Sequence, residues 1–262
     1  MALFILVHSP SVGPRTWSAV AAYLRDAGHP VVVPSLLGVG TGGPPFWPRV
    51  AAEVSAQVEA ARDQSSGANT QHGGTTEPEQ TEPEQIVLVA HSNAGVLVPV
   101  IHRALVPPVA CTALVDATVP ALRDATPMVP EEFLHVLRGL AGPDGLLPRW
   151  TDWWDEPDVA AMFPDPTVRA EVTAEQPQLP LAYYEEQVPV PPGWDDHPCG
   201  YLEFGEPYDA EAREAQRRGW TVRSLPGQHL HQLVDPGGVA RILLDIAGLP
   251  QSSAVDNGAA QA

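Results

Sequence analysis

Short runs of apolar, β-favouring residues alternate along the chain with longer segments whose apolar residues recur at helical spacing. The runs predict strands over residues 3–7, 31–33, 86–89, 110–115, 200–204 and 221–225. The periodic segments predict helices over residues 17–27, 47–62, 94–105, 210–218 and 239–247. Continuous apolar strands separated by amphipathic helices are typical of a parallel sheet with helices on both faces. The sequence therefore predicts a doubly wound α/β fold with a mostly parallel sheet.

Three stretches interrupt this alternation. Residues 63–85 are polar and contain a tandem TEPEQ repeat, so they predict a disordered surface insertion. Residues 251–262 predict a disordered tail. Residues 117–198 are rich in proline and tryptophan, and such a block between two strands predicts a cap at the carboxyl edge of the sheet. Residues 1–116 and 199–250 then form the α/β core.

The segment IVLVAHSNAG, residues 86–95, joins a buried strand to a helix through a tight turn with Ser92 at its apex. This arrangement is typical of a nucleophile elbow, whose strained backbone exposes a serine hydroxyl above the sheet. The strain requires small neighbours, and this chain has Ala90 and Ala94 where the G-x-S-x-G pattern has glycine. An ordinary strand-to-helix turn, in which Ser92 caps the helix, is the alternative interpretation.

A serine hydroxyl becomes a strong nucleophile when a base removes its proton and a third group orients that base. His229 is the candidate base, because it follows the last predicted strand and so returns to the same edge of the sheet. A loop histidine that bonds only to the backbone is the alternative. Asp116 ends an apolar strand, where a carboxylate needs a partner, and is either a functional acid, a helix cap or an anchor for the cap segment.

These motifs, together with HSPS after the first strand and PGQH near the end, occur in the order found in the α/β-hydrolase superfamily. The chain resembles the small capped esterases related to plant hydroxynitrile lyases and methyl esterases, except in residues 63–85 and only weakly in the cap. The resemblance implies an α/β-hydrolase fold that lacks the N-terminal hairpin, with Ser92 as nucleophile and His229 as base. For the acid, Asp116 and Glu206 are equally good candidates, and Asp209 is a weaker one.

The resemblance also implies an oxyanion hole made of two hydrogen-bond donors. One is the backbone N–H of Asn93, the residue after the nucleophile. The other normally comes from the loop after the first strand, where this chain has Pro10, which carries no N–H. The hydroxyl of Ser9 or Ser11, or the N–H of Ser11, is expected to substitute; otherwise the oxyanion is poorly stabilised, which favours a non-hydrolytic role.

The charge balance argues against two classes of partner. The formal net charge is −18, whereas binding to nucleic acid or to an anionic membrane requires clustered Lys and Arg.

No apolar run is long enough to span a membrane, and no basic leader precedes the first strand. Cys111 and Cys199 suggest buried thiols in a reducing compartment. The sequence therefore predicts a cytoplasmic protein and leaves its oligomeric state open.

The expected ligand is a small-molecule substrate without a cofactor or metal. The chain contains no phosphate-binding glycine loop, and its scattered histidines lack the spacing of metal ligands. Three functions are open: a carboxylesterase or thioesterase that acts through an acyl-enzyme on a largely apolar acyl substrate, a lyase or cyclase that uses Ser92 and His229 as acid and base, or a binding protein without catalysis.

Overall fold

Six strands form the central sheet of the computed structural model, which describes residues 1–69 and 85–250. Their order across the sheet is β2-β1-β3-β4-β7-β8, and every neighbouring pair is parallel. The strands are β1 (Ala2–Val7), β2 (Val31–Val32), β3 (Gln85–His91), β4 (Val109–Val115), β7 (Cys199–Glu203) and β8 (Thr221–Ser224). The predicted parallel α/β sheet is confirmed.

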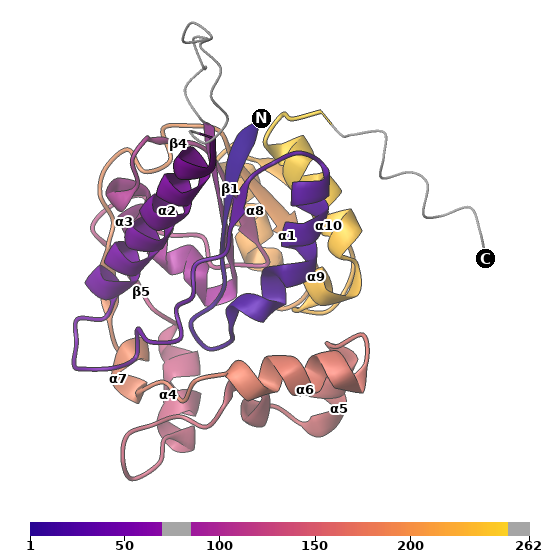
Figure 1. Cartoon of the computed structure of the whole chain (residues 1–262). Helices are drawn as coiled ribbons and strands as arrows, with labels where there is room; N and C mark the ends of the chain where they lie inside the picture. Colours follow the sequence, from indigo (N-terminus) through magenta and orange to yellow (C-terminus); the bar gives the residue numbers. More distant parts are fainter. Residues whose placement is uncertain (70–84, 251–262) are drawn as a thin grey trace, which may run out of the picture.

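Helices cover both faces of this sheet. In β1, Leu3, Ile5 and Val7 pack toward one face and Phe4 and Leu6 toward the other, because successive side chains of a strand alternate. The first face is covered by α2 (Trp47–Asn69), α3 (Val98–Ala104) and α8 (Asp209–Arg217), and the second by α1 (Ser18–Asp26) and α10 (Pro236–Ile246). Figure 1 shows α2 and α3 on one side of β1 and α1 with α10 on the other.

The helix predicted over residues 47–62 is longer than expected. As α2 it continues to Asn69, so the first part of the predicted insertion at 63–85 is helical. Residues 63–69 contain no proline, and polar residues can continue a helix where nothing breaks its backbone hydrogen bonds. The rest of the predicted insertion, residues 70–84, and the predicted tail, residues 251–262, lie outside the described residues.

The segment between β4 and β7 forms a separate group of short elements, which Figure 1 shows below the sheet. Its two short strands, β5 (Ala125–Pro127) and β6 (Gln187–Pro189), pair antiparallel to each other. Its helices are α4 (Glu131–Leu140), η3 (Trp150–Trp153), α5 (Glu156–Ala161), α6 (Pro166–Glu175) and α7 (Leu181–Tyr184). Helix α6 is held to η1 (Pro14–Trp17), because the Arg15 N–H donates to Glu175 and its guanidinium pairs with Glu171 at 3.0 Å.

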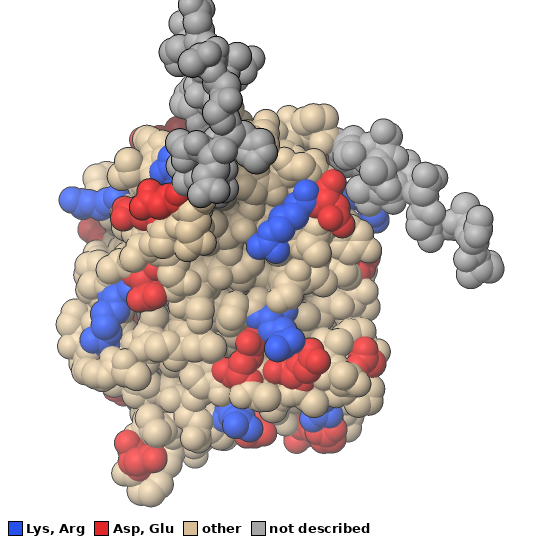
Figure 2. All heavy atoms as spheres, in the orientation of Figure 1, with Lys and Arg blue, Asp and Glu red and all other residues tan. Residues whose placement is uncertain are grey.

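Charged side chains of both signs are interspersed on the face shown in Figure 2. Over residues 1–69 and 85–250, none of the helices combines the length and the apolar character that a membrane crossing needs.

Candidate active site

Ser92 follows β3 directly and adopts an unusual backbone conformation. Its φ is 60°, in a region that costs a non-glycine residue roughly 1–3 kcal/mol. The turn is crowded, since a Cβ atom on Gly95 would lie 2.2 Å from the Thr118 carbonyl oxygen. Ala90 and Ala94 on either side of the serine are fully buried. Small residues therefore let the chain turn sharply here, with the local geometry of a nucleophile elbow.

Side chains from three different loops meet at this carboxyl edge of the sheet. Ser92 Oγ lies 2.9 Å from His229 Nε2, and His229 Nδ1 lies 2.6 Å from Asp116 Oδ2. A carboxylate only accepts hydrogen bonds, so Nδ1 carries the proton and Nε2 is free to accept the serine proton. The hydroxyl of Ser92 thus bonds to an imidazole and makes no cap for η2 (Ser92–Leu97). The loop histidine likewise bonds through its ring, in contrast to the alternative considered for it.

Asp116, rather than Glu206 or Asp209, is the carboxylate that meets His229. It is fully buried, and its second oxygen accepts a hydrogen bond from the Phe204 N–H at 3.0 Å. Glu206 is exposed on the loop between β7 and α8, and Asp209 begins α8. The resemblance gave Asp116 and Glu206 equal weight. In the structure Glu206 is exposed, and the side chain of this loop that contacts His229 is Tyr208.

Two aromatic side chains that the sequence patterns did not single out contact the His229 ring. The ring of His91 lies 4.6 Å away, centroid to centroid, and its Nε2–H donates to the His229 carbonyl at 2.8 Å. Tyr208 stacks on His229 at 5.0 Å with 8° between the planes, and its hydroxyl lies 3.4 Å from Ser92 Oγ. Their only sequence signal is position, since one precedes Ser92 and the other follows Glu206 by two residues.

His91 is suited to a fixed, uncharged role. Burial, followed by the neighbouring His229, lowers the pKa of His91 well below its usual 6.5. A neutral ring that donates through Nε2 holds the backbone of His229 in place without competing for the serine proton. His91 thereby ties the loop that carries His229 to the end of β3.

A chain of hydroxyl groups lies in the loop after β1, where Pro10 cannot donate. Ser9 Oγ and Ser11 Oγ are 2.9 Å apart, and the Tyr184 hydroxyl donates to Ser11 Oγ at 3.0 Å. The hydroxyl of Ser11 can then donate to Ser9, which leaves the Ser9 proton available to another acceptor. This loop therefore contains hydroxyl donors beside the proline.

The side chain of Asn93 is occupied by structural bonds. Its amide nitrogen donates to the Met128 carbonyl at 2.6 Å, and its oxygen accepts from the Tyr183 hydroxyl at 2.9 Å. Both partners belong to the segment between β4 and β7. Asn93 thus fastens this segment to the serine turn through its side chain, while the expected contribution to an oxyanion hole comes from its backbone.

The motifs and the geometry of the site suggest a relationship to the α/β-hydrolase superfamily, and comparison with known protein families tests it. The alpha/beta hydrolase family matches residues 4–242 of the chain. The chain belongs to the alpha/beta hydrolase family. The resemblance drawn from the motifs is therefore confirmed at the level of the superfamily.

Solved structures of similar fold include several esterase-like enzymes. An extracellular alpha/beta-hydrolase from a Paenibacillus species, described as homologous to tobacco salicylic acid binding protein 2, has a TM-score of 0.67 at 15% identity and aligns over 94% of this chain and 99% of its own. Polyneuridine aldehyde esterase has a TM-score of 0.65 at 15% identity, over 94% and 99%. Tomato methylketone synthase I, solved with 2-tridecanone, has a TM-score of 0.64 at 15% identity, over 94% and 98%.

At this identity the structural neighbours establish a shared fold. A comparison with curated protein sequences gives no match. The family match and the esterase-like neighbours together support an enzyme of the hydrolase class.

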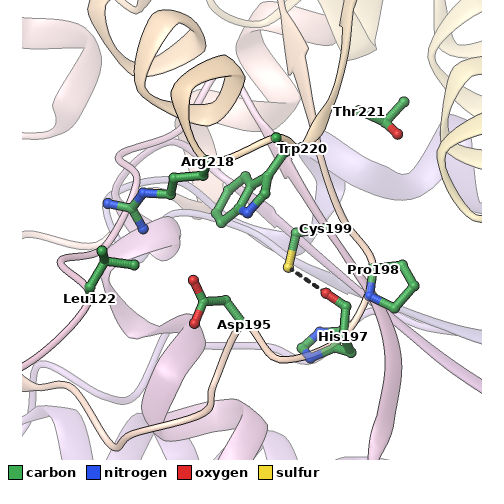
Figure 3. A pocket seen from close by; sticks show the side chains of 9 residues that line it. Leu122, Asp195, His197, Pro198, Cys199, Arg218, Trp220 and Thr221 are labelled. Atoms are coloured by element: carbon green, nitrogen blue, oxygen red, sulfur yellow. Dashed lines mark hydrogen bonds between the residues drawn. The ribbon is translucent and has the colours of Figure 1, made fainter.

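A cavity of about 480 Å³ in this alpha/beta hydrolase lies apart from Ser92, His229 and Asp116. Figure 3 shows Asp195, Arg218 and Trp220 around it, with the Cys199 sulfur nearby. Cys199 begins β7, so the cavity lies at the amino ends of the strands, away from the carboxyl edge that carries Ser92. In the part of the chain that the structure describes, no three His, Cys, Asp or Glu side chains are grouped to hold a metal ion.

His8, at the start of the hydroxyl-bearing loop, should make the folded protein sensitive to acid. Its Nε2 accepts from the Leu36 N–H at 3.0 Å, and its Nδ1–H donates to the Ser9 carbonyl at 2.8 Å. Burial lowers the pKa of His8 from 6.5 to about 4. Between pH 6.5 and about pH 4, His8 binds a proton in the unfolded chain but not in the folded chain. The free energy of unfolding therefore falls as the pH falls through this range. We expect the titration of His8 to lower the free energy of unfolding by roughly 3 kcal/mol when the pH has fallen to about 4.

Urea unfolding between about pH 7 and about pH 4.5 measures this effect. His8→Gln keeps a hydrogen-bond acceptor but cannot titrate, so its stability should depend less on pH than that of the wild type. His135→Gln, on the surface, serves as the matched control and should follow the wild type. Parallel curves for His8→Gln and the wild type would contradict the assignment.

Proposed function

We propose that this alpha/beta hydrolase is a serine hydrolase that cleaves small, largely apolar acyl esters through an acyl-enzyme. The observation that carries the proposal is the continuous series of hydrogen bonds from Ser92 through His229 to the buried Asp116, with heavy-atom distances of 2.9 and 2.6 Å. Nucleophile, base and orienting carboxylate in this geometry generate a reactive serine on unrelated folds.

Each group has a distinct role in the proposed reaction. Ser92 Oγ attacks the acyl carbon while its proton passes to His229 Nε2. Asp116 holds the imidazole in the required tautomer and stabilises the imidazolium that forms. The Asn93 N–H and the Ser9 hydroxyl donate to the developing oxyanion, with the Ser9 hydroxyl taking the place of the N–H that Pro10 lacks. Water then cleaves the acyl-enzyme, with His229 acting as the base.

The surroundings of the histidine support an apolar substrate. The Trp150 ring lies 6.1 Å from the His229 ring, and Trp153 packs edge-on against Tyr184 at 5.7 Å. These aromatic rings come from the segment between β4 and β7. Aromatic side chains commonly line small-molecule sites, and on this side of His229 they favour an apolar substrate.

Labelling with a fluorophosphonate probe tests the proposal. The phosphonyl group should attach to Ser92, as shown by mass spectrometry of the peptide that contains it, because only an activated hydroxyl displaces fluoride. Heat-unfolded protein and the His229→Ala variant are the controls and should remain unlabelled. A correctly folded wild-type protein that does not react would contradict the proposed function.

A non-hydrolytic reaction is the second candidate, and Pro10 is the observation that favours it. If the Ser9 hydroxyl does not reach the oxyanion, acyl transfer loses one donor, which costs about 10²–10³ in rate. Ser92 and His229 would then serve as acid and base in a lyase or cyclase reaction without a covalent intermediate. Activity that survives in Ser92→Ala but not in His229→Ala would support this candidate.

A further inference from the structure

Tyr208 brings a phenol hydroxyl to the place where the serine and histidine meet. It lies in the loop between β7 and α8, one residue before the helix begins. Its ring is nearly parallel to the His229 ring, and its hydroxyl lies 3.4 Å from Ser92 Oγ, which is itself 2.9 Å from His229 Nε2. The phenol hydroxyl and Nε2 therefore approach the same oxygen atom from two stacked rings.

The phenol acts as a donor in this position. The Ser92 proton is directed to His229, so the hydrogen bond between the two hydroxyls runs from Tyr208 to Ser92 Oγ. Burial, followed by the nearby Asp116 and Glu211, raises the pKa of Tyr208 and keeps the phenol protonated. Tyr208 is half-buried, so part of the residue remains accessible beside Ser92.

We infer that Tyr208 is a catalytic residue that donates a hydrogen bond to the leaving-group oxygen during acylation. This inference rests on the proposed function. Ser92 Oγ bonds to the acyl carbon, and its proton goes to His229 Nε2. When the intermediate collapses, the bond from carbon to the alcohol oxygen breaks, its electron pair stays on that oxygen, and Nε2 returns the proton there. Tyr208, stacked on the ring that delivers this proton, stabilises the negative charge before the proton arrives.

This role points to a class of substrate. An alkoxide leaving group develops strong negative charge on oxygen and gains most from a hydrogen bond. A thiolate is less basic, and sulfur is a weak hydrogen-bond acceptor. Tyr208 therefore suits the site to oxygen esters of simple alcohols rather than to thioesters.

The test compares Tyr208→Phe with the wild type on butyrate esters that share one acyl group and differ in the leaving alcohol. The parameter kcat/KM is measured because it reports the steps up to release of the alcohol. We expect a loss of about 10²-fold on ethyl butyrate, since removing one such donor has an effect of this order. The loss should shrink to a few-fold on 4-nitrophenyl butyrate and on the matching ethyl thioester.

Two further variants and a second readout separate catalysis from structure. Tyr23→Phe removes an exposed phenol from α1 and should match the wild type on every ester. Fluorophosphonate labelling of Tyr208→Phe should proceed at a rate close to that of the wild type, because fluoride leaves without such help. Normal labelling thereby shows that Ser92, His229 and Asp116 are still assembled.

Three outcomes would overturn the inference. An equal loss on all esters, together with slow labelling, would mean that Tyr208 only positions His229. No loss on ethyl butyrate would mean that its hydroxyl is not used. A folded wild-type enzyme that neither reacts with the probe nor hydrolyses any ester would remove the proposed function, and the inference with it; the first two outcomes leave that function standing.

Discussion

Ser92→Ala should lower kcat for 4-nitrophenyl butyrate by roughly 10⁶-fold, the effect of removing the nucleophile from a serine protease. Without the hydroxyl the proposed acyl-enzyme cannot form, and only substrate binding and oxyanion stabilisation would remain. Alanine keeps the Cβ atom of the residue at a φ of 60°, so the turn should persist with the same local strain. Initial rates with purified protein and active-site titration with the fluorophosphonate measure the effect.

Ser18→Ala is a suitable control, because Ser18 is an exposed residue at the start of α1 and should leave kcat unchanged. Circular dichroism of Ser92→Ala should match that of the wild type. If the variant kept most of its activity while His229→Ala lost it, the reaction would proceed without a covalent serine intermediate. The acid–base reaction would then replace the proposed serine hydrolase mechanism.

Asp116→Asn should lower kcat by about 10⁴-fold, because it reverses the tautomer of His229, the proposed base. One carboxylate oxygen accepts from the Phe204 N–H and the other from His229 Nδ1–H. The single oxygen of asparagine stays on the backbone donor, so its amide nitrogen faces Nδ1. Nδ1 must then accept, the proton moves to Nε2, and Nε2 can no longer take the proton of Ser92.

Glu206→Gln is the matched control, since it also replaces a carboxylate by an amide but does so on an exposed side chain. We expect its kcat to lie within about twofold of the wild type, as for surface changes that touch no reacting group. Steady-state kinetics of both variants on the same ester decide between the two acids. A large loss in Glu206→Gln with little change in Asp116→Asn would contradict the arrangement of the site.

Local patterns were sufficient for much of the fold. Apolar runs predicted the strands of the parallel sheet within a residue or two, because a strand buried on both faces must be apolar throughout. The small residues around Ser92 indicated the sharp turn, because a crowded turn excludes larger side chains. At Gly95, for example, there is no room for a side chain. The position of His229 after the last strand followed from topology, because parallel strands present their carboxyl ends at one edge.

The end of α2 shows where composition misleads. A polar, repetitive stretch predicted disorder from residue 63, but the helix continues to Asn69. A segment of low hydrophobicity contributes little to a hydrophobic core. Such a composition does not by itself end a helix whose preceding turns pack against the sheet.

The sequence by itself determined the sheet, the serine turn and the histidine that can reach it, because each depends on short-range patterns and on chain order. The tertiary structure alone decided that Asp116 rather than Glu206 meets His229, and that Tyr208 stacks beside it. These choices depend on the direction in which side chains leave two loops. That direction is set by packing between strands far apart in the chain, and spacing along the sequence does not encode it.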